Sequence, residues 1–357
     1  MKLKEVHKIG VVGEGKMGSS IFFYLNGFDY NLSWLCSSEP EKEKALKTFI
    51  KKSRLLFQSG VLTESEYVAK SESTKVTASV DDLKDCDLII EAITEEINAK
   101  RMLFESLHKA VNANCIFTTN SSSIIPSHLI SSESRNDKVA GLHFFFPVPF
   151  KNTVELITGT FTSLQTKESL HHFLLEINKR PFHQTESHAF ILNRLLLDFQ
   201  AEAFQVLLEV KLSYREIDEL VKKSIFPIGV FEFFDYVGID IMLSSVKSYT
   251  QNADNKEFYE PLIQKMEELV KLNRLGIKTR HGFYDYAHPE GSSAINRNEA
   301  NEATDYKNII KDRLWGYYIR SVLSVIESGM CSREDLAWYV KDYMGMDTDP
   351  FILGSFS

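Results

Sequence analysis

The chain has 357 residues, of which 43% are hydrophobic and 25% charged, and its formal net charge at pH 7 is −8. At roughly 150 residues per domain this length suggests at least two domains, and the composition is that of an ordinary globular protein. The acidic balance argues against nucleic acid as a partner, and no apolar stretch approaches the roughly 18 residues that would suggest a membrane span.

The N-terminus and the cysteines favour a cytoplasmic protein without a metal site. Residues 1–7 are too short and too charged for a signal peptide. The cysteines lie far apart and form no C-x-x-C pair, which argues against both a zinc site and a disulfide framework. We therefore expect free, mostly buried thiols at the four positions Cys36, Cys86, Cys115 and Cys331.

Strand-like and helix-like segments alternate in the first half of the chain. Helical periodicity is clearest over Ile97–Val111. Strands that alternate with helices need crossover connections, so residues 1–186 are expected to form a Rossmann-like, doubly wound and mostly parallel α/β sheet. The predicted strands are His7–Val12, Asn31–Cys36, Val76–Ala78, Asp87–Ala92, Cys115–Thr119, Val139–Phe145 and Val154–Thr158.

The strand signal fades after about residue 185, and helical patterns replace it. We expect an all-α domain over residues 187–286. Residues 287–305 are polar and rich in Ser, Asn and Glu, which is typical of a linker. The predicted helices of this domain are Ser187–Val210, Tyr214–Lys223, Ile239–Tyr249 and Phe258–Leu272.

Residues 306–357 carry a partial copy of the first helices of the α domain. Residues 193–223 align with residues 312–342, and Ser213 and Ser332 stand at the same place as helix N-caps. We expect the copy to fold back onto its own helical domain as an intramolecular pseudo-dimer, which leaves a monomer. The alternative is a homodimer to which the copy adds surface. The residues expected to make the contact are Leu314, Tyr318, Val322, Val325 and Ile326.

A glycine-rich loop follows the first predicted strand. Gly13, Gly15 and Gly18 have the G-x-G-x-x-G spacing, with Lys16 and Met17 between the last two glycines. The first glycine permits a tight turn, the second lets a pyrophosphate approach the backbone, and the third lets the next helix pack on the sheet. A merely tight turn is the alternative. The position between a strand and a helix favours a dinucleotide site formed by these five residues.

The residue that holds the adenosine ribose is less clear. An acid is normally expected about 20 residues after the loop, at the end of the second strand. That strand ends here in Cys36, Ser37 and Ser38, and the nearest acid is Glu39. Ser37 can hydrogen-bond either form of the sugar, and residues 36–41 contain no cation for a 2′-phosphate. We expect NAD as the cofactor, with NADP left open.

Polar clusters follow the later strands, where the carboxyl ends of parallel strands converge on a ligand crevice. A further cluster, Phe190–Arg194, begins the long helix of the second domain. The strand-end clusters are Glu91–Glu95 with Lys100, Thr119–Ser123, Gly141–Pro147 and Val154–Leu156.

In order and spacing these motifs resemble the L-3-hydroxyacyl-CoA dehydrogenase family over about residues 8–286, up to the closing motif Gly276–Tyr284. The resemblance implies an NAD-dependent oxidoreductase of fatty acid metabolism (β-oxidation) that interconverts an L-3-hydroxyacyl-CoA and a 3-oxoacyl-CoA. It also implies that His143 is the general acid/base and that Glu155 supports it.

The resemblance assigns the remaining polar residues to substrate and cofactor. Ser122 and Asn193 match positions that bind and orient the substrate oxygen, and Ser122 also lies in the cofactor-binding set. Glu95, Lys100 and Asn120 match positions at the nicotinamide-ribose end. Taken singly, several of these residues have structural alternatives: His143 as a core residue, Glu155 as an exposed edge-strand charge, and Ser122 as a helix N-cap.

The sequence departs from the family pattern at the active crevice. Phe146 stands where the family has Asn, the second-strand acid is missing, and Val230 replaces a proline. Two alternatives therefore stay open. The chain can be a related dehydrogenase of another 3-hydroxy acid, or a catalytically impaired paralogue that binds cofactor or acyl-CoA.

Overall fold

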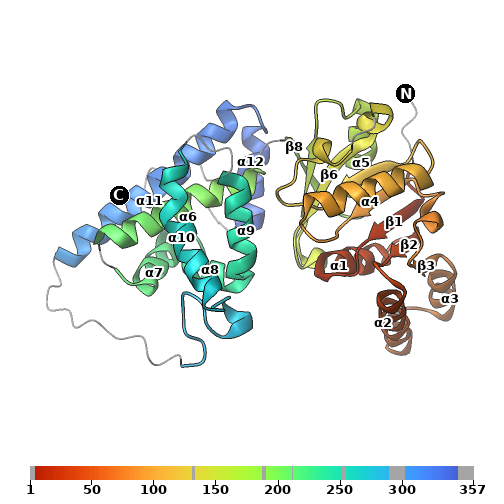
Figure 1. Cartoon of the computed structure of the whole chain (residues 1–357), viewed down its shortest axis with the longest axis horizontal. Helices are drawn as coiled ribbons and strands as arrows, with labels where there is room; N and C mark the ends of the chain where they lie inside the picture. Colours follow the sequence, from red (N-terminus) through yellow and green to blue (C-terminus); the bar gives the residue numbers. More distant parts are fainter. Residues whose placement is uncertain are drawn as a thin grey trace. The chain divides into compact units, whose positions relative to one another are not determined.

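The computed structural model describes residues 5–130, 133–186, 190–210, 212–250, 255–288 and 302–344. The chain forms two compact units, Met1–Ser187 and His188–Ser357. Figure 1 shows that the first combines a sheet with helices and that the second is helical. They are called here the sheet unit and the helical unit, and each is described by itself.

The sheet unit contains an eight-stranded, mostly parallel sheet in the order β3-β2-β1-β4-β5-β6-β7-β8. The one antiparallel pairing joins β6 and β7. The predicted doubly wound α/β fold is therefore confirmed. The strands are β1 (Lys8–Val12), β2 (Asn31–Leu35), β3 (Thr74–Thr77), β4 (Leu88–Glu91), β5 (Ile116–Thr119), β6 (Val139–Phe144), β7 (Thr153–Thr158) and β8 (Arg180–Thr185).

Helices cover both faces of this sheet. The central strands are buried almost throughout, which is typical of parallel strands covered on both sides. The helices are α1 (Lys16–Leu25), α2 (Glu39–Gln58), α3 (Glu64–Glu72), α4 (Ile97–Ala110) and α5 (Leu164–Glu176), with short 3₁₀ turns η1 (Val80–Leu83), η2 (Pro126–Leu129), η3 (Glu133–Lys138) and η4 (Val148–Phe150).

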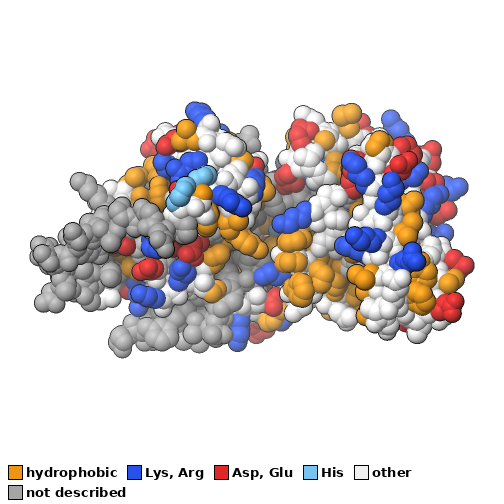
Figure 2. All heavy atoms as spheres, turned by 90° about the horizontal axis from the view of Figure 1, so that it is seen from below, with side chains coloured by type: hydrophobic (Ala, Val, Ile, Leu, Met, Phe, Trp, Pro, Cys, Tyr) orange, Lys and Arg blue, Asp and Glu red, His pale blue; other side chains and the backbone are white. Residues whose placement is uncertain are grey.

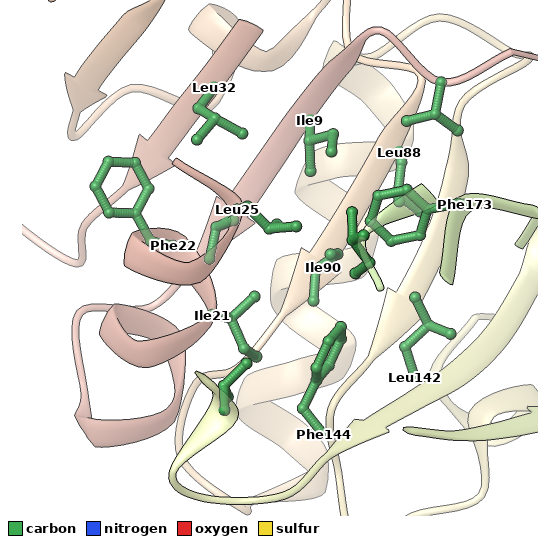
Figure 3. Packing of buried hydrophobic residues seen from close by; sticks show 14 of the residues in the cluster. Ile9, Ile21, Phe22, Leu25, Leu32, Leu88, Ile90, Leu142, Phe144 and Phe173 are labelled. Atoms are coloured by element: carbon green, nitrogen blue, oxygen red, sulfur yellow. The ribbon is translucent and has the colours of Figure 1, made fainter. Parts of the chain in front are cut away.

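Among the described residues of the sheet unit, one apolar cluster lies on each face of the sheet. Side chains alternate between the faces of a strand, so Leu88 and Ile90 of β4 belong to one cluster and Ile89 to the other. Helices α1 and α5 pack on the first face, and α4 packs on the second. Figure 3 shows the first cluster, with α1 and α5 contributing the side chains Ile21, Phe22, Leu25 and Phe173.

The helical unit has no strand among its described residues. It contains a helix, α8, that the sequence patterns did not indicate. Helix α11 begins at Glu302, so residues 302–305, expected in the linker, are helical. The helices are α6 (Ile191–Val210), α7 (Tyr214–Ser224), α8 (Val230–Val237), α9 (Ile239–Thr250), α10 (Lys256–Lys271), the 3₁₀ turn η5 (Ile277–Thr279), α11 (Glu302–Glu327) and α12 (Arg333–Met344).

Helix α11 of the C-terminal copy packs against α6 (Figure 1). Arg313 pairs with both Glu202 and Glu209 of α6. The Ser321 Oγ donates a hydrogen bond to Asp198 Oδ2 at 2.7 Å. The copy thus folds back onto its own helical unit. Of the five apolar residues expected at this contact, Ile326 is half-buried, and the four that are fully buried are Leu314, Tyr318, Val322 and Val325.

On the face of the molecule seen in Figure 2, acidic, basic and hydrophobic side chains are interspersed over the described parts of both units. No helix among the described residues is both long enough and apolar enough to cross a membrane.

Candidate active site

The glycine loop joins β1 to α1. Gly13 has φ = +112°, a left-handed conformation that favours glycine, and a Cβ on Gly18 would lie 2.1 Å from the Gly13 carbonyl oxygen. A Cβ on Gly15 would meet nothing within 4 Å, so the backbone is open there. Helix α1 begins at the next residue, Lys16, and the unpaired N–H groups of its first turn include that of Met17. This arrangement fits the pyrophosphate of a dinucleotide.

Ser37 lies directly beyond β2 and contacts the glycine loop. Its backbone N donates a hydrogen bond to Glu14 Oε2 at 3.2 Å, and its Oγ donates to Glu14 Oε1. Ser38 has a different role, because it caps α2 by accepting a hydrogen bond from the backbone N of Glu41. The sequence reasoning did not single out Glu14, which occupies a variable position of the loop motif.

His143 and Glu155 are paired across antiparallel strands. They are register partners on β6 and β7, and the His143 Nδ1 lies 2.5 Å from Glu155 Oε2. His143 is 9% exposed and Glu155 is fully buried, so Glu155 is not an exposed edge-strand charge. An ionised carboxylate can only accept a hydrogen bond, so Nδ1 carries the hydrogen that it donates to Glu155. Nε2 is then the ring nitrogen that can take up a proton.

A buried carboxylate at the end of β4 organises the centre of the site. Glu91 accepts from Lys100 Nζ at 2.5 Å, from Thr119 Oγ1 at 2.6 Å and from the Ile93 backbone N at 2.7 Å. Lys100 is 1% exposed, and its ammonium also lies 3.5 Å from Glu95 Oε2. Lys100 is therefore held between two carboxylates. The sequence analysis gave Glu91 no role in the site. Its position at a strand end, as the first acid of the E-A-x-x-E motif, could have indicated one.

Glu95 holds the serine loop after β5. Its Oε1 accepts from the backbone N of Ser122 and of Ser123, each at 3.1 Å, and from the hydroxyls of Ser121 and Ser123. Burial opposes ionisation of Glu95, but the Lys100 ammonium and these hydrogen bonds outweigh it and lower its pKa. Ser122 is not a helix N-cap, because the next helical turn, η2, is capped at Ile125.

Asn120, Phe145 and Phe146 make contacts at the end of β6 and in the loop that follows it. The Asn120 side-chain oxygen accepts from the Phe144 backbone N at 2.8 Å, which fastens the end of β5 to β6. The Phe145 ring lies 4.5 Å from the His143 ring in an edge arrangement. Phe146 is 41% exposed, and Lys16 Nζ lies 4.1 Å from its ring centroid. The loop after β6 therefore contacts the glycine loop through this cation–π pair.

Comparison with known proteins decides the family. The model of the 3-hydroxyacyl-CoA dehydrogenase NAD binding domain matches residues 8–187, and that of the 3-hydroxyacyl-CoA dehydrogenase C-terminal domain matches residues 190–286. The chain belongs to the 3-hydroxyacyl-CoA dehydrogenase family. The predicted family, its NAD cofactor and its oxidoreductase class are thereby confirmed.

Curated members of the 3-hydroxyacyl-CoA dehydrogenase family resemble the chain over most of their length. A 3-hydroxybutyryl-CoA dehydrogenase of Clostridioides difficile is 34% identical over 281 residues, covering 78% of this chain and 99% of that protein. The human mitochondrial hydroxyacyl-coenzyme A dehydrogenase is 33% identical over 293 residues, covering 79% of this chain and 91% of that protein.

Solved structures extend the likeness. The (S)-3-hydroxybutyryl-CoA dehydrogenase of Ralstonia eutropha is 34% identical, with a TM-score of 0.70 over 79% of this chain and 99% of that one. The 3-hydroxybutyryl-CoA dehydrogenase of Escherichia coli is 21% identical, with a TM-score of 0.83 over 99% of this chain and 92% of that one. At that identity the second likeness concerns the fold, and it includes the C-terminal copy.

The side chain of one predicted site residue cannot be placed beside the others. Asn193 belongs to α6 of the helical unit, and its side chain lies outside the described residues. The other predicted residues belong to the sheet unit: the glycine loop and Ser37 follow β1 and β2, Glu95 and Lys100 follow β4, Asn120 and Ser122 follow β5, and His143 and Glu155 face each other on β6 and β7.

Proposed function

We propose that this enzyme interconverts a short-chain L-3-hydroxyacyl-CoA, of the 3-hydroxybutyryl class, and the matching 3-oxoacyl-CoA, with His143 as general acid/base. The observation that carries the proposal is the buried His143–Glu155 pair at 2.5 Å, in register across β6 and β7. The short-chain preference is supported by the similar proteins of Clostridioides difficile and Ralstonia eutropha, both of which are 3-hydroxybutyryl-CoA dehydrogenases.

In the oxidation direction, His143 Nε2 takes the proton of the substrate hydroxyl. The Glu155 carboxylate accepts the hydrogen of Nδ1, holds the ring and stabilises the imidazolium that forms. When bound, NAD supplies the acceptor for the hydride that leaves the carbon bearing this hydroxyl. In the reverse direction the imidazolium returns its proton to the oxygen.

Serine and asparagine side chains orient the substrate oxygen in this proposal. Glu95 supports the role of Ser122, because its carboxylate accepts a hydrogen bond from the Ser122 backbone N and so fixes the position of that residue. The role of Asn193 rests on the Phe190–Arg194 motif. Each side chain can donate a hydrogen bond to the oxygen that reacts.

The cofactor is held by the glycine loop and by the network around Glu91. Open backbone at Gly15 and the start of α1 receive the pyrophosphate. Asn120 and Glu95 lie at the nicotinamide-ribose end. The ammonium of Lys100 is buried against Glu91 and Glu95, so Lys100 acts as a positioning residue that keeps Glu95 in place.

Phe146 favours two alternatives, because a phenyl ring cannot replace the hydrogen bonds of the family's asparagine. The chain is then a dehydrogenase of another 3-hydroxy acid, or an impaired paralogue that binds cofactor or acyl-CoA. NADH absorbance with acetoacetyl-CoA, a longer 3-oxoacyl-CoA and free acetoacetate separates the candidates. We expect the highest kcat/KM with acetoacetyl-CoA. A preference for the free acid contradicts the thioester assignment, and no oxidation of NADH with any of them supports the impaired paralogue.

The oligomeric state and the compartment complete the proposal. A monomer is supported by α11, which covers part of α6 within the same chain. A cytoplasmic location is supported by the free thiols, three of which are buried: Cys36, Cys86 and Cys115. Light scattering and imaging of a fluorescent fusion test the two statements.

A further inference from the structure

The carboxylate that stands at the end of β2 comes from the glycine loop rather than from β2 itself. Dinucleotide-binding sheets normally hold the adenosine ribose with an acid at the end of the second strand. Here Ser37 occupies that place, and both its backbone N and its Oγ donate to the Glu14 carboxylate. We infer that Glu14 replaces the missing strand acid, binding the adenosine ribose hydroxyls of NAD and excluding the 2′-phosphate of NADP.

The residue before Glu14 is tied to the end of β2 by two hydrogen bonds. The preceding residue, Gly13, donates its N–H to the Leu35 carbonyl oxygen at 2.9 Å. The Gly13 carbonyl oxygen accepts from the indole Nε1 of buried Trp34, also at 2.9 Å. Both partners belong to the last residues of β2. Gly13 therefore cannot leave the strand end without breaking two hydrogen bonds, one of them to a buried side chain. Glu14 follows Gly13 directly and is held near the end of β2 with it.

Glu14 retains acceptor capacity for a ligand. A carboxylate has about four acceptor sites on its two oxygens, and Ser37 uses one on each oxygen. Glu14 is half-buried, so its remaining sites are accessible. Two vicinal ribose hydroxyls match two carboxylate oxygens, and hydrogen bonds to a charged acceptor are among the stronger ones.

The charges around this strand end disfavour a phosphate. Burial, together with the negative charges of Glu14 and Glu41, raises the pKa of the neighbouring Cys36 thiol to about 12, against the opposite effect of Lys42. Lys42 is itself engaged, with its Nζ 2.7 Å from Glu39 Oε2. A 2′-phosphate, which carries close to two negative charges, meets a carboxylate here without an uncommitted cation among the residues just named.

The inference rests on the proposed function only in assuming that the chain binds a nicotinamide dinucleotide. Its test therefore measures dinucleotide binding and not the rate of the dehydrogenase reaction. The full-length chain is titrated with NADH and with NADPH by fluorescence. ADP-ribose and its 2′-phosphate serve as competitors that lack the nicotinamide. The test variant is Glu14→Gln, which keeps the size of the side chain. The matched control is Glu64→Gln, which neutralises an exposed acid in the first turn of α3 and leaves Glu14, Glu39 and Lys42 unchanged.

We expect the wild type to bind NADH at least about tenfold more tightly than NADPH. Glu14→Gln should reduce this ratio by about tenfold or more, because the loss of one charge weakens NADH binding and strengthens NADPH binding. Glu64→Gln should leave the ratio within about twofold, since that carboxylate is exposed and belongs to α3 rather than to the glycine loop or β2. The two competitors should follow the same order.

Equal weakening of both dinucleotides in Glu14→Gln would show that Glu14 only holds the loop, and it would overturn the inference. So would a wild type that binds NADPH as tightly as NADH, or a control variant with the same change of ratio. Glu14→Ala is the second variant if the first does not fold, as judged by circular dichroism, and an unchanged ratio in either folded variant contradicts the assignment.

Discussion

Phe146 is the residue at which this site departs most visibly from its family. Its ring is 41% exposed and lies under the ammonium of Lys16, the first residue of α1. The family's asparagine can donate and accept hydrogen bonds at this position, whereas a phenyl ring can only fill space and attract a cation.

We predict that Phe146→Asn raises kcat with acetoacetyl-CoA severalfold, because the amide restores hydrogen bonds in the crevice and releases Lys16. Phe150→Asn, at a ring that is 81% exposed, is the matched control and should leave kcat unchanged. A fall in kcat for Phe146→Asn alone would instead make Phe146 part of a reshaped substrate pocket. Steady-state kinetics with NADH and acetoacetyl-CoA gives the answer.

Glu95 makes the serine loop sensitive to acid. Its folded pKa lies below the ordinary glutamate value of about 4.3, since Lys100 and the serine hydrogen bonds outweigh burial. A lowered folded pKa means that ionised Glu95 adds stability above about pH 4.3, and that this contribution is lost as the pH falls through the folded pKa.

We therefore predict that wild type exceeds Glu95→Gln in free energy of unfolding at pH 6–7, and that the difference shrinks towards pH 3.5. Urea unfolding of both proteins at several pH values measures it. The difference should be modest, because the side chain is partly exposed. A difference that grows as the pH falls would contradict the role given to Glu95.

Not all of the site could be read from single residues. His143 and Glu155 were assigned from the family resemblance and the order of its motifs, whereas the antiparallel pairing of β6 with β7 that brings them together was not predicted. Glu14 could not be recognised, since a variable position in a glycine loop does not reveal which way its side chain turns. The burial of Lys100 likewise depends on Glu91, nine positions earlier, through a contact that only the folded strand end creates.

At the scale of elements, continuous apolar runs were the most reliable signal. β4 and β5 are buried at every residue and were predicted. β8 (Arg180–Thr185) was not, because its sequence RPFHQT has no apolar run and it owes its place to pairing with β7. The start of α11 was also missed, since residues 302–305 are polar and its first described buried apolar side chain is Ile310.

Arg313 of α11 forms ion pairs with two carboxylates of α6. Arg313 binds Glu202, which is 1% exposed, and Glu209, which is 53% exposed. Burial raises the pKa of Glu202 even though Arg313 opposes the rise. We predict that Arg313→Met destabilises the protein by about 2 kcal/mol, because it leaves the buried carboxylate without its cation.

Glu209→Gln is the control for this prediction and should cost less than about 1 kcal/mol, as expected for an exposed pair. Chemical denaturation of the two variants and the wild type compares them. Equal losses in the two variants would contradict a special role for the buried Glu202.

At the scale of the whole molecule, the C-terminal copy covers an apolar face of its own helical unit. Leu314, Tyr318 and Val322 of α11 are fully buried within the same chain. We predict a monomer for the full chain. A chain that ends at Tyr286 should dimerise or aggregate, because removal of α11 exposes the apolar face that it covers. Light scattering on both chains tests this, and a stable full-length dimer paired through α6 would refute it.

The most direct test of the proposed dehydrogenase chemistry is the rate of NADH oxidation by acetoacetyl-CoA in wild type and in His143→Gln. His128→Gln, at an exposed histidine of the same unit, serves as the control. We predict that His143→Gln loses about a hundredfold to ten-thousandfold in kcat, while its Kd for NADH stays within about twofold and the control keeps its rate. A His143→Gln enzyme with nearly normal kcat would contradict the assignment of His143 as the acid/base.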